Sequence, residues 1–279
     1  MKQKQYHPGV GPTGELSLRV SVAVLVRVLF KNPLDGNVMI ALERTATLIN
    51  DEGKPDVVVK AKPFGGGVRL LQTQKLKQLI GDYHYDSERS REEADLRIMI
   101  NPDQWEKVKE ICRDHLIDGE DGFINSSPVR ELTEEFEDNL GERIISDVYS
   151  LTPREMLVEE KLTATENVNA PGIPTKRIYY LFDALLEDLR IIEMMIDNNR
   201  QFSDLDLQIM AIKDARHGGK GRANAVLTVS LEKLMEFYRS SPKESGTPIM
   251  FEGHQLDGNV PAILDLPLIQ TPSAPRRSS

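Results

Sequence analysis

The sequence is poor in cysteine and tryptophan, with one residue of each, and it contains no long uninterrupted apolar run. A single cysteine, Cys112, excludes an intrachain disulfide and is typical of proteins from a reducing cytoplasm. The most apolar stretch, residues 20–30, contains Arg27 and is too short to cross a bilayer as a helix. The first fifteen residues lack the apolar core of a signal peptide. We therefore expect a cytoplasmic protein without membrane segments.

Positive charge is also in short supply. The 279 residues carry a formal net charge of −9, with 39% hydrophobic and 28% charged residues. Nucleic acids and anionic membranes attract proteins of positive potential, so this balance argues against general binding to either. The length allows a substantial core in one large domain or two small ones. Composition thus predicts an ordinary globular protein.

The first part of the chain reads as an antiparallel strand pair followed by a strand that ends in glycine. Residues 1–15 are rich in glycine and proline and are expected to form a flexible arm. Valines alternate with other residues through 16–30, which is typical of a strand. Asp35 and Gly36 indicate a hairpin turn before the next strand. A further strand then runs into three consecutive glycines, Gly65–Gly67.

Capping residues predict two helices in the middle of the chain. One covers residues 101–116, and the other begins after Ser127 and ends before Gly141. Residues 187–216 fit a helix or a strand equally well, whereas residues 226–240 change from a strand to a helix. Strands that bracket helices in this way predict an α+β fold around a mixed sheet, with parallel crossovers left open.

The second of these helices concentrates negative charge on one face. Glu131, Glu134 and Glu135 lie at positions i, i+3 and i+4, and Arg130 can pair with Glu134. Charge runs of this kind are usually solvated faces. The other interpretation is a cation site, since Mg²⁺ or Mn²⁺ prefers oxygen ligands and often binds carboxylates together with substrate phosphates. Gly65–Gly67 would complete such a site, because glycine lets backbone N–H groups approach an anion.

Together, the segments "PFGGG" and "RELTEE" resemble the box of the Nudix family. The family has a much shorter spacer where this chain has residues 68–129, so a long segment is inserted. Gly122 stands at the position of the first glutamate of the box. Glu137 and Asp138 replace its closing glycine and apolar residue. The half of the box that holds the metal is therefore intact, and the carboxylate on the loop side is missing or moved.

The resemblance implies a Nudix-like α/β/α sandwich around a mixed β-sheet. It covers residues 16–240, with an α/β insertion at 70–122 between the glycine loop and the box helix. A C-terminal extension, residues 241–279, follows and contains several prolines, so we expect its end to be disordered. The insertion is compatible with homo-oligomerisation.

The resemblance also implies metal-dependent hydrolysis of the diphosphate bond of a nucleoside diphosphate derivative. Its expected catalytic residues are Glu131, Glu134 and Arg130, and its expected ligands of Mg²⁺ (or Mn²⁺) are Glu131, Glu134 and Glu135. The expected substrate-binding residues are Gly65, Gly66, Gly67 and Arg44. The alternative is a non-catalytic Nudix-like module that senses a nucleotide or binds a protein, which the altered box favours and the intact row of glutamates opposes.

Other candidates carry weaker indications. A general base is expected among the box glutamates or further along the chain, at Glu159, Glu160 or Glu166. Residues 217–222 combine glycines with Lys220 and Arg222, which suits an anion but is more typical of a hairpin turn. Cys112, Tyr179 and Tyr180 are expected to pack in the core.

Overall fold

The computed structural model describes residues 18–51, 54–115, 122–141, 149–164, 173–240 and 248–264. The predicted flexible arm and the end of the C-terminal extension lie outside these residues. No helix in the described part of the chain is both long and apolar enough to cross a membrane.

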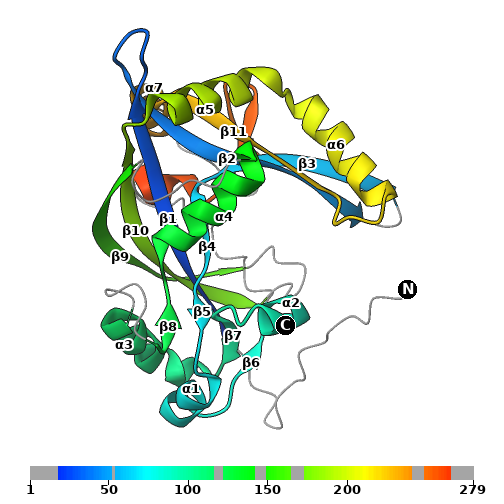
Figure 1. The fold of residues 1–279 in the computed structure, drawn as a ribbon. Coiled ribbons are helices and arrows are strands. Elements are labelled where there is room, and N and C mark those ends of the chain that lie inside the picture. The colour runs from blue at the N-terminus through cyan, green and yellow to red at the C-terminus, as the bar shows by residue number, and fades with distance from the viewer. Residues whose placement is uncertain are drawn as a thin grey trace.

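One large mixed sheet organises the described residues (Figure 1). Its strands are β1 (Leu18–Lys31), β2 (Val38–Asp51), β3 (Lys54–Lys62), β4 (Phe64–Gly67), β6 (His84–Tyr85), β7 (Arg97–Ile100), β9 (Tyr149–Ala164), β10 (Pro174–Leu186), β11 (Arg222–Ser230), β12 (Ile249–Phe251) and β13 (His254–Leu256). A separate pair consists of β5 (Arg69–Leu70) and β8 (Ile124–Asn125). The predicted hairpin is present as antiparallel β1 and β2, whereas β1 and β10 run parallel.

Strand β1 is the centre of the fold because four other strands pair with it. These are β2, β4, β7 and β10. Its alternating valines all point to one face, where Val20, Val22 and Val24 are fully buried. Leu25 points to the opposite face and belongs to a different hydrophobic cluster. A strand with partners on both edges, whose valines all face the same core, fits the valine alternation in the sequence.

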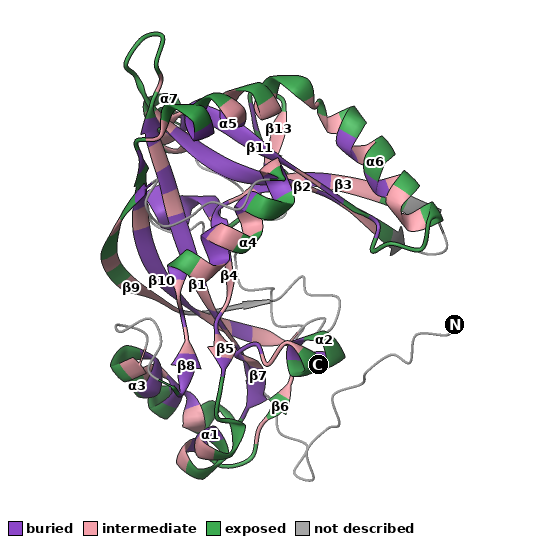
Figure 2. Ribbon diagram, viewed as in Figure 1, coloured by how far each residue is buried: buried purple, intermediate pink, exposed green. Residues whose placement is uncertain are grey.

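Helices cover both faces of this sheet. They are α1 (Thr73–Ile80), α2 (Glu88–Glu92), α3 (Trp105–His115), α4 (Pro128–Leu140), α5 (Leu189–Gln201), α6 (Asp204–Arg216) and α7 (Leu231–Ser240), with short 3-10 helices η1 (Pro102–Gln104) and η3 (Val260–Leu264). Phe136 of α4 and Met195 of α5 join the cluster of the β1 valines. Leu234 of α7 joins the cluster of Leu25 on the other face. Figure 2 shows that the outward sides of the helices are the exposed ones. The fold is therefore α+β, as expected, and the ambiguous residues 187–216 form two helices.

The three glycines are part of a strand and not a loop, which corrects the expectation from the sequence. Strand β3 ends at Lys62, and β4 then pairs antiparallel with β1, with Gly66 opposite Val24. Gly65 has a φ of +130°, a backbone conformation that residues with a side chain rarely adopt. An added Cβ there would also collide with the backbone of Val24. We call residues 65–67 the glycine segment below.

The predicted insertion contributes strands to the main sheet. Strand β7 pairs with β1, with Ser21 opposite Arg97, and β6 pairs with β7. A buried ion pair ties the insertion to β1, since the guanidinium of Arg19 lies 2.7 Å from the carboxylate of Asp86. Ser90 donates a second hydrogen bond to Asp86. The insertion therefore pairs with β1, the same strand that pairs with the glycine segment.

The ion pair between Arg19 and Asp86 predicts a large stability effect. In Asp86→Ala, Arg19 stays buried but loses its carboxylate, and such uncompensated charges destabilise proteins strongly. We expect the free energy of unfolding, measured by urea titration, to fall by about 3 kcal/mol. The control is Asp82→Ala, an exposed aspartate of the same insertion, which should leave the urea midpoint unchanged. Equal midpoints for Asp86→Ala and wild type would contradict a structural role for this pair.

Candidate functional site

Helix α4 begins and ends as its sequence predicts. The Ser127 hydroxyl accepts a hydrogen bond from the Arg130 N–H, Pro128 is the first helical residue, and Gly141 ends the helix in a left-handed conformation. Phe136 is fully buried and stacks on Phe64 of β4, with ring centroids 5.1 Å apart. Because Glu131 and Glu135 lie four residues apart, this packing presents both carboxylates to the glycine segment.

Glutamates of α4 contact the backbone of the glycine segment directly. The Gly65 N–H donates a hydrogen bond to Glu135 Oε2 at 2.9 Å. The missing Cβ of Gly66 leaves room for the Glu131 carboxylate, which an added Cβ would overlap. At Gly67 an added Cβ would lie 2.6 Å from Asp95 Oδ1. Gly66 and Gly67 are therefore required for different reasons, because successive positions of a strand face opposite sides.

Arg130 connects the helix to the end of the glycine segment. Its guanidinium contacts the Glu131 carboxylate, donates to Glu134 Oε2 at 3.4 Å and donates to the Gly67 carbonyl oxygen at 3.4 Å. Glu134 also lies 3.5 Å from the guanidinium of Arg69. Glu134 is half-exposed and lies between two arginines, whereas Glu131 is only 5% exposed. The predicted trio of Arg130, Glu131 and Glu134 thus forms one connected group.

A second ionic group holds Glu135 from the other side. Lys62 Nζ lies 2.6 Å from Glu43 Oε2 and 3.7 Å from Glu135 Oε1. Lys62, Glu43 and Asp95 all lie beside the glycine segment or its carboxylates, although no motif in the sequence marks them. The one signal that could have found Glu43 is the alternation of strand residues 38–51, which places Glu43 and Arg44 on opposite faces.

Burial and mutual repulsion shift the acidity of these carboxyl groups. Burial raises the pKa of Glu131 to about 7; Glu134 and Asp95 add to the shift, and Arg130 opposes it. The pKa of Glu135 is raised by burial and by Glu43, against the effect of Lys62. Burial alone would lower the pKa of Lys62, but the two glutamates outweigh it and raise that pKa. Burial therefore disfavours the charged form of both glutamates, and the neighbouring cations do not fully offset this effect.

Arg44 does not reach this group, which corrects its expected contact with substrate. Its side chain is 1% exposed and lies on the face of β2 opposite Glu43. The guanidinium lies 3.2 Å from Asp204 Oδ1 and donates a hydrogen bond to the Phe202 carbonyl oxygen at the start of α6. His254 Nδ1 contacts the same aspartate at 3.2 Å. Arg44 thus fastens α6 to the sheet.

The remaining candidates have structural surroundings in the described part of the chain. Glu159 pairs with Arg177 at 3.1 Å, whereas Glu166 and the side chain of Glu160 lie outside the described residues. Residues 217–221 form a turn that joins α6 to β11, so the expected hairpin turn between two strands is wrong, and the Gly221 N–H is bonded to Asp214. Cys112 and both tyrosines are buried, as expected, and the Tyr179 hydroxyl donates to Asn259 Oδ1 at 2.8 Å.

The donor chemistry of the site fits a magnesium-type ion, but the structure contains no complete ligand set. Among the described residues, no group of three or more His, Cys, Asp or Glu side chains is arranged to hold a metal. Mg²⁺ is commonly held by one or two carboxylates with substrate phosphates, so a preformed cage is not required. Burial raises the pKa values of Glu131 and Glu135, and a bound cation would favour their charged forms.

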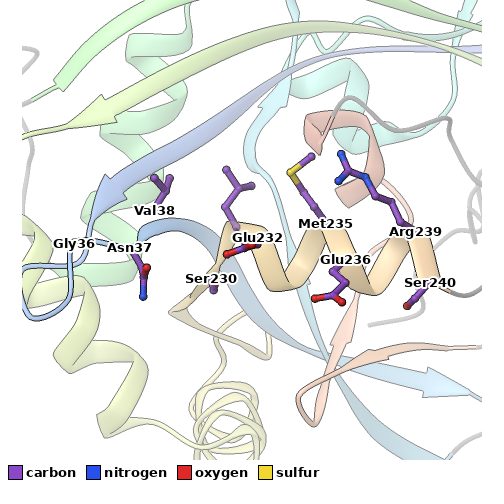
Figure 3. Close-up of a pocket in the computed structure, with 10 residues that line it drawn as sticks. Gly36, Asn37, Val38, Ser230, Glu232, Met235, Glu236, Arg239 and Ser240 are labelled. Carbon is purple, nitrogen blue, oxygen red and sulfur yellow. The ribbon is translucent and has the colours of Figure 1, made fainter.

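An open cavity lies away from this group. It has a volume of about 850 Å³ between the β1–β2 turn and α7, and Asn37, Val38, Met235 and Arg239 are among its lining residues (Figure 3). None of the residues predicted for the site lines it. The glycine segment has no comparable hollow at Gly66, because the Glu131 carboxylate occupies the space beside it.

Comparison with known proteins does not place the chain in a family. No protein-family model matches the sequence, and no curated protein matches it. Any assignment of function therefore depends on the residues of this chain.

The raised pKa of Glu131 predicts a pH-dependent stability. The folded state binds this proton more tightly than the unfolded state, whose ordinary value is 4.5. The stability from this group is thus full below the ordinary value and is lost as the pH rises through about 7. Between pH 5.5 and 8 we expect a loss of roughly 2 kcal/mol in the free energy of unfolding.

Urea titrations of wild type and Glu131→Gln at several pH values measure this contribution. The neutral glutamine removes the contribution of Glu131 but leaves that of Glu135, so the variant should lose less stability over the same pH range. Parallel pH profiles for the two proteins would contradict the raised pKa.

Proposed function

We propose that this protein is a Nudix-type hydrolase, with an α/β/α sandwich, that cleaves the diphosphate bond of a nucleoside diphosphate derivative with the help of Mg²⁺ or Mn²⁺. One observation carries the proposal. The glycine segment and the helix with the R-E-x-x-E-E sequence lie far apart in the chain, yet the Gly65 N–H donates to Glu135 and Glu131 lies against Gly66. Helices on both faces of the mixed sheet are compatible with the proposed sandwich.

Glu131 suits the role of general base. A base is most effective when its pKa lies near the working pH, and burial raises the pKa of Glu131 to about 7. In the proposed reaction, water adds to one phosphorus atom and gives its proton to Glu131. The bridging P–O bond breaks, and two phosphate monoesters leave. Arg130 would hold Glu131 in place during this step, because it contacts that carboxylate and the Gly67 carbonyl oxygen.

Phosphate oxygens would meet positive charge beside the glycine segment. Arg69 is partly exposed and lies near Glu134, and guanidinium groups bind phosphate in two-pronged fashion. The Gly67 N–H faces the same side of β4 as the Gly65 N–H, since alternate groups of a strand point the same way. Glu131 and Glu135 are the residues that would hold the cation, with Glu134 beside them. When bound, the cation would offset the charge of the diphosphate.

A non-catalytic module for nucleotide sensing or protein interaction is the second candidate, and a specific observation favours it. Each predicted metal ligand already contacts a cation: Glu131 contacts Arg130, Glu134 contacts two arginines, and Glu135 contacts Lys62. Carboxylates paired in this way stabilise the contact between α4 and β4 without any metal. A non-catalytic binding protein requires only these ion pairs and no metal site.

Turnover measurements separate the two functions. The purified protein is incubated with Mg²⁺ or Mn²⁺ and a panel of nucleoside diphosphate sugars, dinucleoside polyphosphates and nucleoside triphosphates, and the products are separated by chromatography. We expect hydrolysis of at least one compound and a fall in kcat of roughly 100-fold or more in Glu131→Gln, because a general base contributes about that much.

Glu137→Gln is the matched control, since Glu137 is an exposed glutamate of the same helix. It should keep the activity of wild type. Tight nucleotide binding without product release, in wild type and in Glu131→Gln alike, would replace the hydrolase with the binding module.

A further inference from the structure

The face of β1 opposite α4 is partly open around Ser21. Val20, Val22 and Val24 are fully buried on the α4 side. Ser21 and Ala23 point to the other side and are only half-buried, although β1 has strand partners on both edges. A central strand is normally covered on both faces, but the small Ser21 near the start of β1 leaves a low floor there, whereas Ala23 packs against the second hydrophobic cluster. This part of the sheet is therefore accessible where a core would be expected.

Three arginines from three neighbouring strands surround this floor. Arg97 of β7 and Arg177 of β10 are the register partners of Ser21 on its two sides, and Arg19 lies two residues before Ser21 on the same face. Strands β7 and β10 are separated by β1, which places them roughly 10 Å apart. Arginine side chains are long enough to converge across that distance. We call Arg19, Ser21, Arg97 and Arg177 the Ser21 surface.

The Arg19 guanidinium is close enough to Arg97 and Arg177 to be repelled by both. The pKa of Arg19 is lowered by burial, and Arg177 and Arg97 lower it further, against the opposing effect of Asp86. Each arginine has a carboxylate partner from a different element: Asp86 for Arg19, Asp95 for Arg97 at 3.3 Å and Glu159 for Arg177 at 3.1 Å. These carboxylates fix the directions of the side chains.

The pairing leaves the two outer arginines accessible. Arg19 is buried with Asp86, but the side chains of Arg97 and Arg177 are 32% and 25% exposed. A guanidinium has five N–H donors, and the contact of Arg97 with Asp95 is made through one terminal nitrogen. A guanidinium with N–H donors at an accessible surface suits a phosphate group, which accepts several hydrogen bonds at once.

We propose that the Ser21 surface binds a phosphate-bearing small molecule, with Arg97 and Arg177 contacting its phosphate group over Ser21. The site is separate from the α4 carboxylates, because it lies on the other face of β1. It adjoins the glycine segment, since Gly67 is the register partner of Ala23 and its open side meets Asp95, the partner of Arg97. The insertion thus supplies one wall of the surface. This inference does not require the proposed hydrolase activity.

Calorimetric titration with inorganic pyrophosphate in the presence of EDTA tests the proposal without any turnover. We expect binding to the full-length wild type, and a roughly tenfold increase in Kd for Arg97→Gln and for Arg177→Gln, because each removes a charge-assisted hydrogen bond. Ser21→Leu fills the floor without changing any charge and should abolish binding. Circular dichroism of each variant establishes that it is folded.

Two control variants locate the bound anion. Arg216→Gln changes an exposed arginine at the end of α6, and Arg69→Gln changes the partly exposed arginine beside Glu134. Arg216→Gln should bind pyrophosphate as wild type does. Arg69→Gln tests whether the anion binds at the glycine segment instead, and binding that survives in it supports the Ser21 surface. Binding that is lost in Arg69→Gln but kept in Arg177→Gln would assign the anion to the glycine segment and overturn the proposal. Absence of pyrophosphate binding at millimolar concentration in wild type would overturn it as well.

Discussion

Contact between the carboxylates of α4 and the backbone of β4 is the constraint on which the site depends. Glu135 accepts the Gly65 N–H, and Glu131 occupies the space that a side chain at Gly66 would fill. Carboxylates buried in this way need compensation, because burial disfavours their charged form. The surrounding cations supply this compensation, since Arg130 contacts Glu131 on the same helix and Lys62 of β3 lies near Glu135.

The hydrophobic core holds this contact in register. Phe136 of α4 stacks on Phe64, the residue just before the glycines, so the same helix that buries an aromatic ring also delivers its glutamates. Strand β1 is shared by every part of the arrangement, since the glycine segment, the insertion and β10 all pair with it. Its two faces differ near its start: one is a closed aliphatic core, and the other carries arginines around Ser21 before it joins a second core at Leu25.

The charged side chains near the glycine segment form several ion pairs rather than one cluster. Glu134 lies between Arg69 and Arg130, Glu135 shares Lys62 with Glu43, and Glu131 keeps a raised pKa despite its arginine. The ion pairs hold α4 against β4, but burial still disfavours the charged form of Glu131. A hydrolase would offset that cost by binding a cation with its substrate, whereas a binding module would use the ion pairs alone.

Local patterns in the sequence determined the elements that depend on neighbouring residues. The capping residues around α4, the valine alternation of β1 and the change from strand to helix at residues 226–240 are of this kind, because propensity and capping act within a few positions. Partners that come from distant segments were decided only by the tertiary structure. No local pattern places Glu43, Lys62 and Asp95 beside the site, or buries Arg44 against Asp204 instead of near substrate, because burial and ion pairing depend on which segments the sheet brings together.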